Sequence, residues 1–581
     1  MIRWLHAIRE EEEGAFGPKA AGLARAIELG MRVAPGFALN AQDLEALESK
    51  EGWRAFQEAL SQLEEMERFR GVPLAVALRP SGARLSGSDR SSLLGVGVKG
   101  ESLEALGEWL GETSLALDLR RRFLKGFAKL LGKRGHLRAG ERLFETFDHS
   151  WLEREVGALE EEVGLAGASS EDELRQALFL LAKGTPALVV QVMRYGVAKG
   201  GHSGAGVAAS HHPLSGEAGL YGEIVWGRMG EDLTLGRRLG CPIRKEGLPE
   251  HSESLEVRLP RLYSELDFWI KQGEKAMDCP VSLEFVIERE HLWVVQFSPW
   301  PLAGSAEVRY FVERVKTGSL GQREALLRIR PDALNALARL EVEKESHAAI
   351  GVGLAASPGA ASGLWVVENE EAERALEKGS PYVLVRHEIG PEDAMLVRKA
   401  RAVVTLSGGL TSHAAVMCRA LGKPCVVSLR GLKVVGRQLC RFEGTEVADL
   451  KAGWLTVDGS RGRVYEGIMP LRRVGESWVE EVLGWAEGHA RVPLLLWAEL
   501  ASEVAKLGAD GWFDGERAWD KEGQERPEWR FCMRWSPGEP WPQAEAVLVE
   551  PEFLVAARLR AAQAALCVGN PQVPLTKGKD K

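Results

Sequence analysis

The chain has 581 residues, which is more than one hydrophobic core accommodates, so we expect three or four domains. Its hydrophobic content of 45% and charged content of 27% are those of an ordinary soluble globular protein. A formal net charge of −9 provides no basic field, which argues against nucleic acid as a partner.

The sequence also argues against a membrane protein and against a secreted protein rich in disulfides. No apolar stretch reaches the roughly 18 residues that a membrane-spanning helix needs. The first residues, with Arg3, His6 and an acidic run from Glu10, do not follow a signal-peptide pattern. The seven cysteines include no Cys-x-x-Cys pair, so we expect reduced thiols, a cytoplasmic location and no membrane partner.

The first third of the chain mixes helical and strand patterns. Small and apolar residues at helical spacing predict a helix over Ala20 to Leu29, which Gly30 ends. The apolar run Leu74 to Leu78 predicts a strand, and the charged stretch Glu101 to Leu131 is expected to be helical. This mixture suits an α+β nucleotide-binding domain.

Apolar runs predict further strands at Pro186 to Met193, Leu283 to Ile287 and Leu292 to Gln296. A charge-rich helical connector is expected over Ser319 to Lys344. A new compact unit is then expected from residue 351 to about residue 467.

The most informative segment runs from Gly408 to Val427 and places His413 after a glycine turn and a Thr-Ser pair, where an apolar helical stretch begins. Glycines allow the tight turn. A Ser or Thr cap would leave a helix N-terminus that offers N–H groups and partial positive charge to an anion. A neutral imidazole there suits a covalent phosphoenzyme, although a histidine beside a helix cap is also an ordinary surface or capping residue.

This segment, with Thr411-Ser412-His413 followed by Lys423-Pro424-Cys425, resembles the phosphohistidine segment of the pyruvate, phosphate dikinase family. The resemblance extends from about residue 10 to residue 515 through a series of shorter motifs. These are Gly17 to Leu23, Pro35-Gly36-Phe37, Arg79 with Ser81 to Arg84, Asp118 to Phe123, Ser203 to Val207, Ser215 to Glu217, Leu220 to Glu223, and Arg386 with Glu388, Pro391, Glu392 and Asp393.

The resemblance implies a multidomain fold of α+β and α/β parts. An ATP-grasp nucleotide-binding domain with its helical connector is expected over residues 1–340. A phosphohistidine swivelling domain, the PEP-utilising enzyme mobile domain, is expected over residues 341–470. Residues 471–581 are expected to form a short α/β remnant of the family's C-terminal barrel.

The resemblance also implies roles for single residues. His413 matches the phosphoryl carrier, and Thr411 matches a threonine that a regulatory protein phosphorylates in some dikinases, with a helix cap as the alternative. ATP is expected as substrate and Mg²⁺ as cofactor. Nucleotide binding falls to Lys19, Arg79, Arg122, Glu284 and Gln296, and Mg²⁺ to Glu284 and Gln296. Without the resemblance, Lys19 reads as an ordinary first-turn lysine and Glu284 as the polar face of a strand.

Several departures from the family pattern predict a degenerate ATP site. Ser282 and Ser298 replace an acidic residue and a phosphate-binding arginine, and His211-His212 replaces an Arg-Asn pair. The loop Ser86 to Ser92 lacks the family's Pro-Gly-Met-Met pattern. We expect the site still to bind nucleotide but to cleave ATP inefficiently. Arg90 or His211 could replace the lost arginine contact in part.

Just over a hundred residues follow Gly467, whereas a (β/α)₈ barrel takes about 250. We therefore expect a phosphotransferase in which ATP phosphorylates His413 for onward transfer, but which does not interconvert pyruvate and phosphoenolpyruvate alone. The acceptor would be a separate barrel-bearing chain or a small molecule. The alternative is a catalytically weak, regulatory or nucleotide-binding paralogue of the dikinase.

Overall fold

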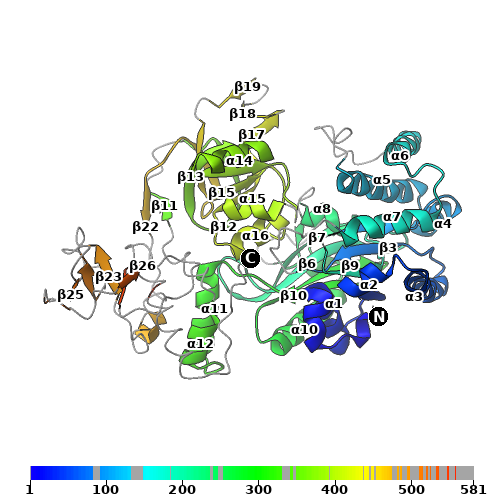
Figure 1. Cartoon of the computed structure of the whole chain (residues 1–581), viewed down its shortest axis with the longest axis horizontal. Helices are drawn as coiled ribbons and strands as arrows, with labels where there is room; N and C mark the ends of the chain where they lie inside the picture. The colour runs from blue at the N-terminus through cyan, green and yellow to red at the C-terminus, as the bar shows by residue number, and fades with distance from the viewer. Residues whose placement is uncertain are drawn as a thin grey trace.

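The N-terminal half of the chain is built on two five-stranded sheets, and the histidine segment belongs to a separate barrel (Figure 1). The computed structural model describes residues 2–82, 92–132, 148–183, 185–235, 240–245, 253–329, 340–343, 348–390, 393–435, 437–443, 446–450, 453–473, 481–482, 484–486, 494–497, 510–513, 518–520, 524, 526, 532–534, 546–548 and 557. Together these parts form a mixed α/β protein of several units, as the sequence predicts.

The first sheet has the strand order β1-β2-β5-β3-β4. Its strands are β1 (Arg3–Trp4), β2 (Gly36–Asn40), β5 (Ala187–Val192), β3 (Val76–Pro80) and β4 (Leu93–Val96). The central strand β5 is buried along its whole length, as its nearly continuous apolar sequence predicts. Much of the sheet's core comes from the helices α3 (Lys50–Arg68), α5 (Thr113–Leu130), α6 (His149–Val163) and α7 (Ser170–Ala182).

The helical stretch predicted from Glu101 to Leu131 is confirmed, but it forms two helices rather than one. Helix α4 (Glu101–Leu110) ends where Gly111 adopts the left-handed conformation, with φ 85°. Helix α5 then begins at Thr113. Glycine adopts this conformation without steric cost and commonly ends helices.

The second sheet is antiparallel and has the order β10-β9-β6-β7-β8. Its strands are β10 (His291–Pro299), β9 (Val281–Glu288), β6 (Gly204–His211), β7 (Ala218–Trp226) and β8 (Cys241–Pro242). The strands predicted at Leu283 to Ile287 and Leu292 to Gln296 are confirmed. Alternate residues such as Leu283 and Phe285 share a core with residues of α10 (Pro260–Met277), which leaves the opposite face for polar side chains.

Helix α1 (Glu13–Glu28) packs against β10 and contains the predicted helix from residue 20. A Cβ atom on Gly22 would lie 2.0 Å from the carbonyl oxygen of Phe297, so only glycine permits this approach. Gly17 interrupts the helix with φ 78°, and a Cβ atom there would lie 1.8 Å from the Ser81 carbonyl oxygen. The opening motif therefore fixes α1 against both sheets.

The connector is helical only in part. Helices α11 (Gly304–Lys316) and α12 (Gln322–Arg328) are followed by a short strand, β11 (Leu340–Val342), within the stretch predicted to be helical to Lys344. Strand β11 pairs antiparallel with β22 (Leu471–Arg473). The chain thus enters and leaves the histidine unit through neighbouring strands.

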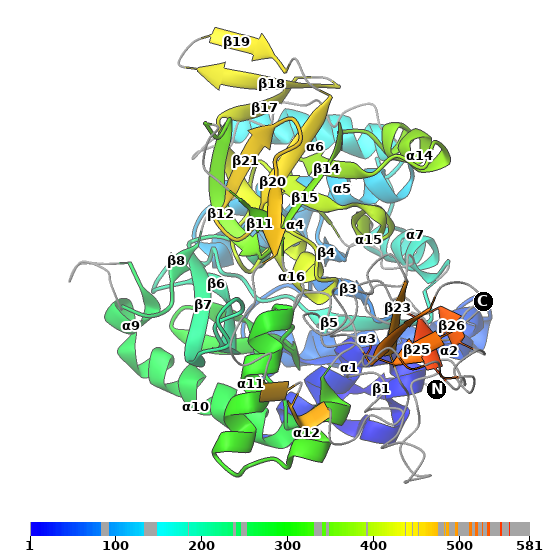
Figure 2. The ribbon, with the colours of Figure 1, turned by 90° about the vertical axis from the view of Figure 1, so that its left-hand side faces the viewer.

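The histidine unit is a closed barrel in the order β12-β16-β15-β14-β13-β20-β21. Its strands are β12 (Gly351–Ser357), β16 (Cys425–Arg430), β15 (Ala402–Thr405), β14 (Tyr382–Arg386), β13 (Ala360–Val366), β20 (Trp454–Asp458) and β21 (Arg463–Glu466). Helices α14 (Asn369–Glu377), α15 (Ala394–Lys399) and α16 (His413–Ala420) accompany it. Figure 2 shows α16 on the side of the barrel that faces the N-terminal sheets.

The remaining elements are short. They are helices α2 (Ala41–Ala46), α8 (Gly230–Thr234) and α9 (Leu255–Arg258), strands β17 (Leu432–Val435), β18 (Gln438–Glu443) and β19 (Glu446–Asp449), and strands β23 (Leu494–Trp497), β24 (Gly511–Phe513), β25 (Ala518–Asp520), β26 (Cys532–Arg534) and β27 (Ala546–Leu548). The last five form one sheet in the order β25-β24-β23-β27-β26. None of the helices in the described ranges has the length and hydrophobicity to cross a membrane.

Candidate functional site

Arg79 lies at the junction of the two N-terminal sheets and joins residues of three other strands. Its Nη1 donates to Gln191 Oε1 at 2.9 Å, and its Nη2 donates to Gln296 Oε1 at 2.9 Å. The same Nη2 lies 3.5 Å from Glu284 Oε2. Burial lowers the pKa of Arg79, while Glu284 acts in the opposite direction. The guanidinium is thus held by groups that the sequence assigns to nucleotide and metal binding.

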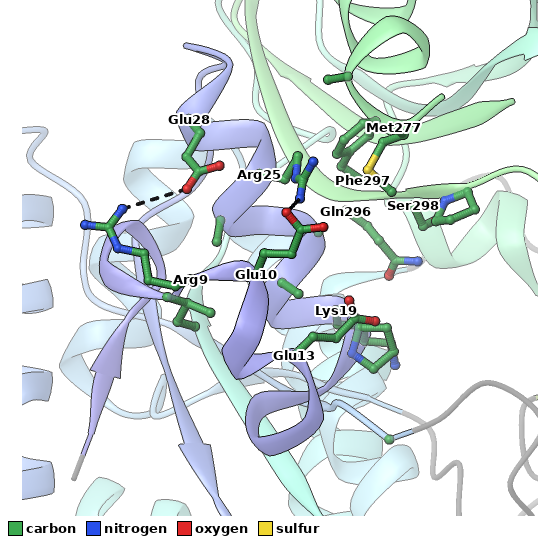
Figure 3. Close-up of a pocket in the computed structure, with 18 residues that line it drawn as sticks. Arg9, Glu10, Glu13, Lys19, Arg25, Glu28, Met277, Gln296, Phe297 and Ser298 are labelled. Atoms are coloured by element: carbon green, nitrogen blue, oxygen red, sulfur yellow. Dashed lines mark ion pairs between the residues drawn. The ribbon is translucent and has the colours of Figure 1, made fainter. Parts of the chain in front are cut away.

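Lys19 lies beside this cluster. Its Nζ donates to the carbonyl oxygen of Pro80 at 2.7 Å, next to Arg79 in the chain. Lys19, Gln296 and Ser298 line a pocket with a volume of about 300 Å³ (Figure 3). Two ion pairs, Arg25–Glu10 at 2.5 Å and Arg9–Glu28 at 3.9 Å, belong to the same pocket.

Two serines occupy the positions where the resemblance expects opposite charges. Ser282 on β9 lies directly across from Ser298 on β10. Their hydroxyl oxygens are 3.3 Å apart, and the Ser282 hydroxyl lies 3.4 Å from the Ser298 carbonyl oxygen. The two serines therefore satisfy each other, and neither brings a charge to the pocket.

Arg122 lies outside the Arg79 cluster. On helix α5 it donates to Asp118 Oδ2 at 2.7 Å and to Asp232 Oδ1, on helix α8, at 2.6 Å. Although its burial acts to lower it, these two carboxylates raise the pKa of Arg122. The ion pairs give Arg122 a structural task between α5 and α8.

One row of residues runs across the second sheet at the level of the Arg79 cluster. Gln296 pairs with Glu284, Glu284 with Val207, and Val207 with Glu223. Residues directly opposite each other in antiparallel strands point to the same face. Glu223 and Glu284 therefore share a face, with backbones about 10 Å apart at two strand spacings.

The histidine segment contacts this row. Thr411 Oγ1 donates to Glu223 Oε2 at 2.5 Å, and the Thr411 N–H donates to the same oxygen at 3.2 Å. A Cβ atom on Gly409 would lie 2.7 Å and 2.8 Å from the two Glu223 carboxylate oxygens. Gly409, four residues before His413, thus leaves the space that the Glu223 carboxylate occupies, and an added Cβ atom would make that carboxylate shift.

His413 itself contacts the end of helix α8. Its Nδ1 lies 3.0 Å from the carbonyl oxygen of Thr234. Because a carbonyl oxygen only accepts hydrogen bonds, Nδ1 carries the proton in this contact. The lone pair of the neutral ring then lies on Nε2, which makes Nε2 the nucleophilic atom.

Arg419 stabilises the histidine segment through backbone carbonyl groups. It donates to the carbonyl oxygens of Leu410 at 2.9 Å and Ala356 at 3.0 Å. Its guanidinium lies 5.1 Å from the ring centroid of Trp300, which follows β10 in the N-terminal half. Burial lowers the pKa of Arg419 to about 10. This arginine therefore links the histidine loop both to the barrel and to the N-terminal half.

The expected hydroxyl cap on the histidine helix is wrong. Ser412 is the N-cap residue of α16, but its side chain accepts no bond from the helix N–H groups. The buried Ser412 hydroxyl has no hydrogen-bond partner in the described part of the protein. Thr411 lies one residue before the N-cap position, and its hydroxyl donates to Glu223.

The structure thus gathers four of the five predicted nucleotide residues, Lys19, Arg79, Glu284 and Gln296, and brings His413 and Thr411 to the same sheet. Arg122 lies apart, and residues 86–91 of the predicted phosphate loop lie outside the described residues. Sequence reasoning assigned no role to Glu223, Thr234 or Trp300. For Glu223 a signal existed, because it ends the quoted motif Leu220 to Glu223.

The predicted magnesium ligands form a small donor set. Glu284 and Gln296 supply a carboxylate and an amide oxygen from paired positions of β9 and β10. Such oxygens suit Mg²⁺, which keeps several other ligands from water and phosphate. Within the described residues there is no group of three or more His, Cys, Asp or Glu side chains placed to hold a metal by themselves.

Comparison with known proteins gives a consistent result. Residues 378–462 match the family model "PEP-utilising enzyme, mobile domain". The chain is 29% identical over 575 residues to pyruvate, phosphate dikinase of Rhizobium meliloti, covering 88% of the chain and 63% of that relative. It is 31% identical over 332 residues to the Rickettsia prowazekii enzyme, covering 56% and 37%. It is 28% identical over 568 residues to the Clostridium symbiosum enzyme, covering 88% and 64%. The chain thus spans less than two thirds of the length of these relatives.

Proposed function

Because this chain belongs to the pyruvate, phosphate dikinase family of PEP-utilising enzymes, we propose that it is a phosphotransferase in which ATP phosphorylates His413. We assign nucleotide binding to an ATP-grasp domain formed by the two N-terminal sheets. The barrel acts as a swivelling domain that carries the phosphoryl group onward.

A single observation supports this proposal most strongly. The loop that carries His413 is bonded to Glu223, two strands away from Glu284 in one row of the sheet. Glu284 and Gln296 also contact Arg79, and Lys19 is bonded to the neighbouring Pro80 carbonyl. Glu284, Gln296 and the acid that holds the histidine loop thus share one face of the second sheet, which brings the carrier toward the groups assigned to the donor.

The transfer uses the tautomer that the Thr234 contact selects. The Nε2 lone pair of His413 forms a bond to a phosphorus atom of ATP, and the phosphoryl P–O bond breaks with its electron pair on the leaving oxygen. The proton stays on Nδ1, bonded to the Thr234 carbonyl, so the phosphorylated ring carries a positive charge that offsets the phosphoryl anion. Lys19 and Arg79 supply fixed positive charge for the oxygens of the donor.

A bound Mg²⁺ ion would neutralise part of the phosphate charge. Glu284 and Gln296 are the residues that would hold it, since their paired positions present oxygen atoms to the same face. Gln296 Oε1 already accepts a hydrogen bond from Arg79, which leaves one of its two lone pairs for a cation.

A specific observation also favours the second function, a catalytically weak nucleotide-binding or regulatory paralogue. Ser282 and Ser298 bond to each other where the resemblance implies an acid and a phosphate-binding arginine. A charge-assisted bond is worth about 1.5–3 kcal/mol. Its loss would slow ATP cleavage more than it weakens nucleotide binding, because the missing charge acts on the transition state.

We propose a separate barrel-bearing chain or a small molecule as the acceptor of the phosphoryl group. Pyruvate offered to the isolated phosphorylated protein is then expected to leave the label on His413. Release of the label to pyruvate without a second protein would contradict this part of the proposal.

The phosphotransferase proposal is tested by incubating the protein with Mg²⁺ and ATP labelled at either the β or the γ position. The expected result is an acid-labile, base-stable label that His413→Ala abolishes. The position of the label identifies the transferred phosphoryl group. A wild-type protein that binds ATP but acquires no label overturns the phosphotransferase reading in favour of the regulatory one.

A further inference from the structure

We infer that Glu223 is a positioning residue for the phosphoryl carrier, which it holds on the N-terminal sheet by accepting the hydroxyl and amide hydrogens of Thr411. The inference rests on the proposed function, because it concerns how His413 reaches the donor. It assigns Thr411 a task as a hydrogen-bond donor in the unmodified protein.

The first argument is the chemistry of the contact. Glu223 Oε2 accepts two hydrogens from the same residue, at 2.5 Å from the hydroxyl and 3.2 Å from the backbone nitrogen. Such a pair fixes both the position and the direction of the loop, since a charged acceptor strengthens each bond. His413 follows Thr411 by only two residues, so the loop cannot turn without displacing the imidazole.

The second argument is that the loop is shaped to receive a carboxylate. Gly409 leaves the space that the Glu223 oxygens occupy, and any larger side chain would meet them within 2.8 Å. Thr411, which makes this contact, is only 4% exposed. A general surface contact between two domains needs neither the missing Cβ atom nor a buried hydroxyl donor.

The third argument is the place of Glu223 in the sheet. Strand β7 pairs with β6, and β6 with β9, without a bulge between Glu223 and Glu284. Because these strands pair in register, the contact with Glu223 fixes the position of Thr411 relative to Glu284 and Gln296. Glu223 itself shows no hydrogen bond to either of these two residues in the described structure, so it acts through the loop.

Burial of the acid supports the same reading. Desolvation raises the pKa of Glu223, while the Thr411 hydroxyl and amide act to lower it. A carboxylate is costly to bury unless hydrogen-bond donors compensate it. The Thr411 donors therefore have a physical task that no apolar side chain can replace.

The test compares two donors of phosphoryl groups to His413. ATP requires the N-terminal sheets, whereas phosphoramidate phosphorylates exposed histidines directly and needs no docking. We expect Glu223→Ala and Thr411→Val each to slow labelling at saturating ATP at least tenfold, with the KM for ATP changed less than threefold. Labelling by phosphoramidate is expected to stay within threefold of wild type.

Conservative and control variants make the result specific. Thr411→Ser keeps the hydroxyl and is expected to recover most of the rate that Thr411→Val loses. The double variant Glu223→Ala/Thr411→Val is expected to be no slower than either single variant, because both remove one contact. Gly409→Ala should behave like Glu223→Ala, whereas Gly453→Ala, with only an ordinary contact at 3.7 Å, should label as wild type.

Three results would overturn the inference: wild-type rates in Thr411→Val, an equal loss with both phosphoryl donors, or a loss that appears only in the KM for ATP. Amide hydrogen exchange gives a readout without ATP, since the Thr411 N–H is bonded to Glu223. Exchange at Thr411 should accelerate at least tenfold in Glu223→Ala. If wild type takes no label from ATP but this exchange responds, the proposed function fails and the positioning contact stands. If the exchange does not respond, the positioning contact fails.

Discussion

Ser298→Arg is expected to raise the rate at which ATP labels His413. Ser298 lies two residues after Gln296 on the same face of β10, and both line the pocket next to Lys19. The substitution places a guanidinium where the resemblance implies a phosphate-binding arginine. It therefore tests directly whether the missing charge limits the phosphotransferase.

The expected change in rate follows from comparing the contact that Ser298 makes now with the contact that an arginine would make. Its hydroxyl contacts the Ser282 hydroxyl at 3.3 Å, a neutral bond worth about 1 kcal/mol at most. A guanidinium on a phosphate contributes about 1.5–3 kcal/mol, or roughly 10- to 150-fold in rate. Glu10 and Glu13 line the same pocket and compete for the new charge, so the lower part of this range is expected.

The assay is single-turnover labelling of His413 with ATP in excess, in the wild type and the variant. Ser298→Gln serves as the control, because it adds a polar side chain of similar reach without a charge. We expect a faster rate only with arginine. Equal rates in all three proteins, with ATP bound in each, would show that the serine pair does not limit transfer.

Three further predictions concern charge and stability. Thr411→Glu sets a second carboxylate against Glu223 and should slow ATP-dependent labelling at least 100-fold; a rate within tenfold of wild type would contradict this. Arg194 donates two hydrogen bonds to the buried Glu67, at 3.0 Å and 3.1 Å. Arg194→Met should therefore lower the free energy of unfolding, measured in urea, by about 3 kcal/mol. A loss below about 1 kcal/mol would show that this ion pair does not stabilise the fold. Burial lowers the pKa of His211 to about 4 from 6.5. The unfolded chain therefore binds a proton between pH 7.5 and pH 5 that the folded protein does not, and stability should fall by about 2 kcal/mol over this range. In His211→Phe the free energy of unfolding should change less between pH 7.5 and pH 5. An unchanged pH dependence would show that other groups cause it.

Much of the fold could be predicted because its strands are apolar and local. The runs at β5, β9 and β10 identify themselves by composition, and their alternation separates the core face from the polar face. The break at Gly111 could not be seen, since helical residues continue on both sides. Strand β11 was missed for a different reason, because its partner β22 lies about 130 residues later.

The site was predictable where a motif carries the chemistry and hidden where the contact is non-local. Lys19, Glu284 and Gln296 stand in motifs, and the sheets bring them to one pocket or cluster. The partner of Thr411 is 188 residues away, and nothing in either segment specifies the pairing. Arg122 shows the reverse case, because its motif matched but its ion pairs commit it to Asp118 and Asp232.

A carrier must bind its donor site firmly enough to react and weakly enough to leave. Four interactions described above join the histidine segment to the N-terminal half: the hydroxyl and N–H bonds from Thr411 to Glu223, the bond from His413 to Thr234, and the contact of Arg419 with Trp300. Hydrogen bonds and cation–π contacts contribute about 1 kcal/mol each in net terms. Together they favour the docked state by about 4 kcal/mol, or roughly 1,000-fold. Under the proposed function, a phosphoryl anion on His413, two residues from Thr411, would be repelled by an ionised Glu223, so the transfer would weaken the contact that holds the loop on the sheet.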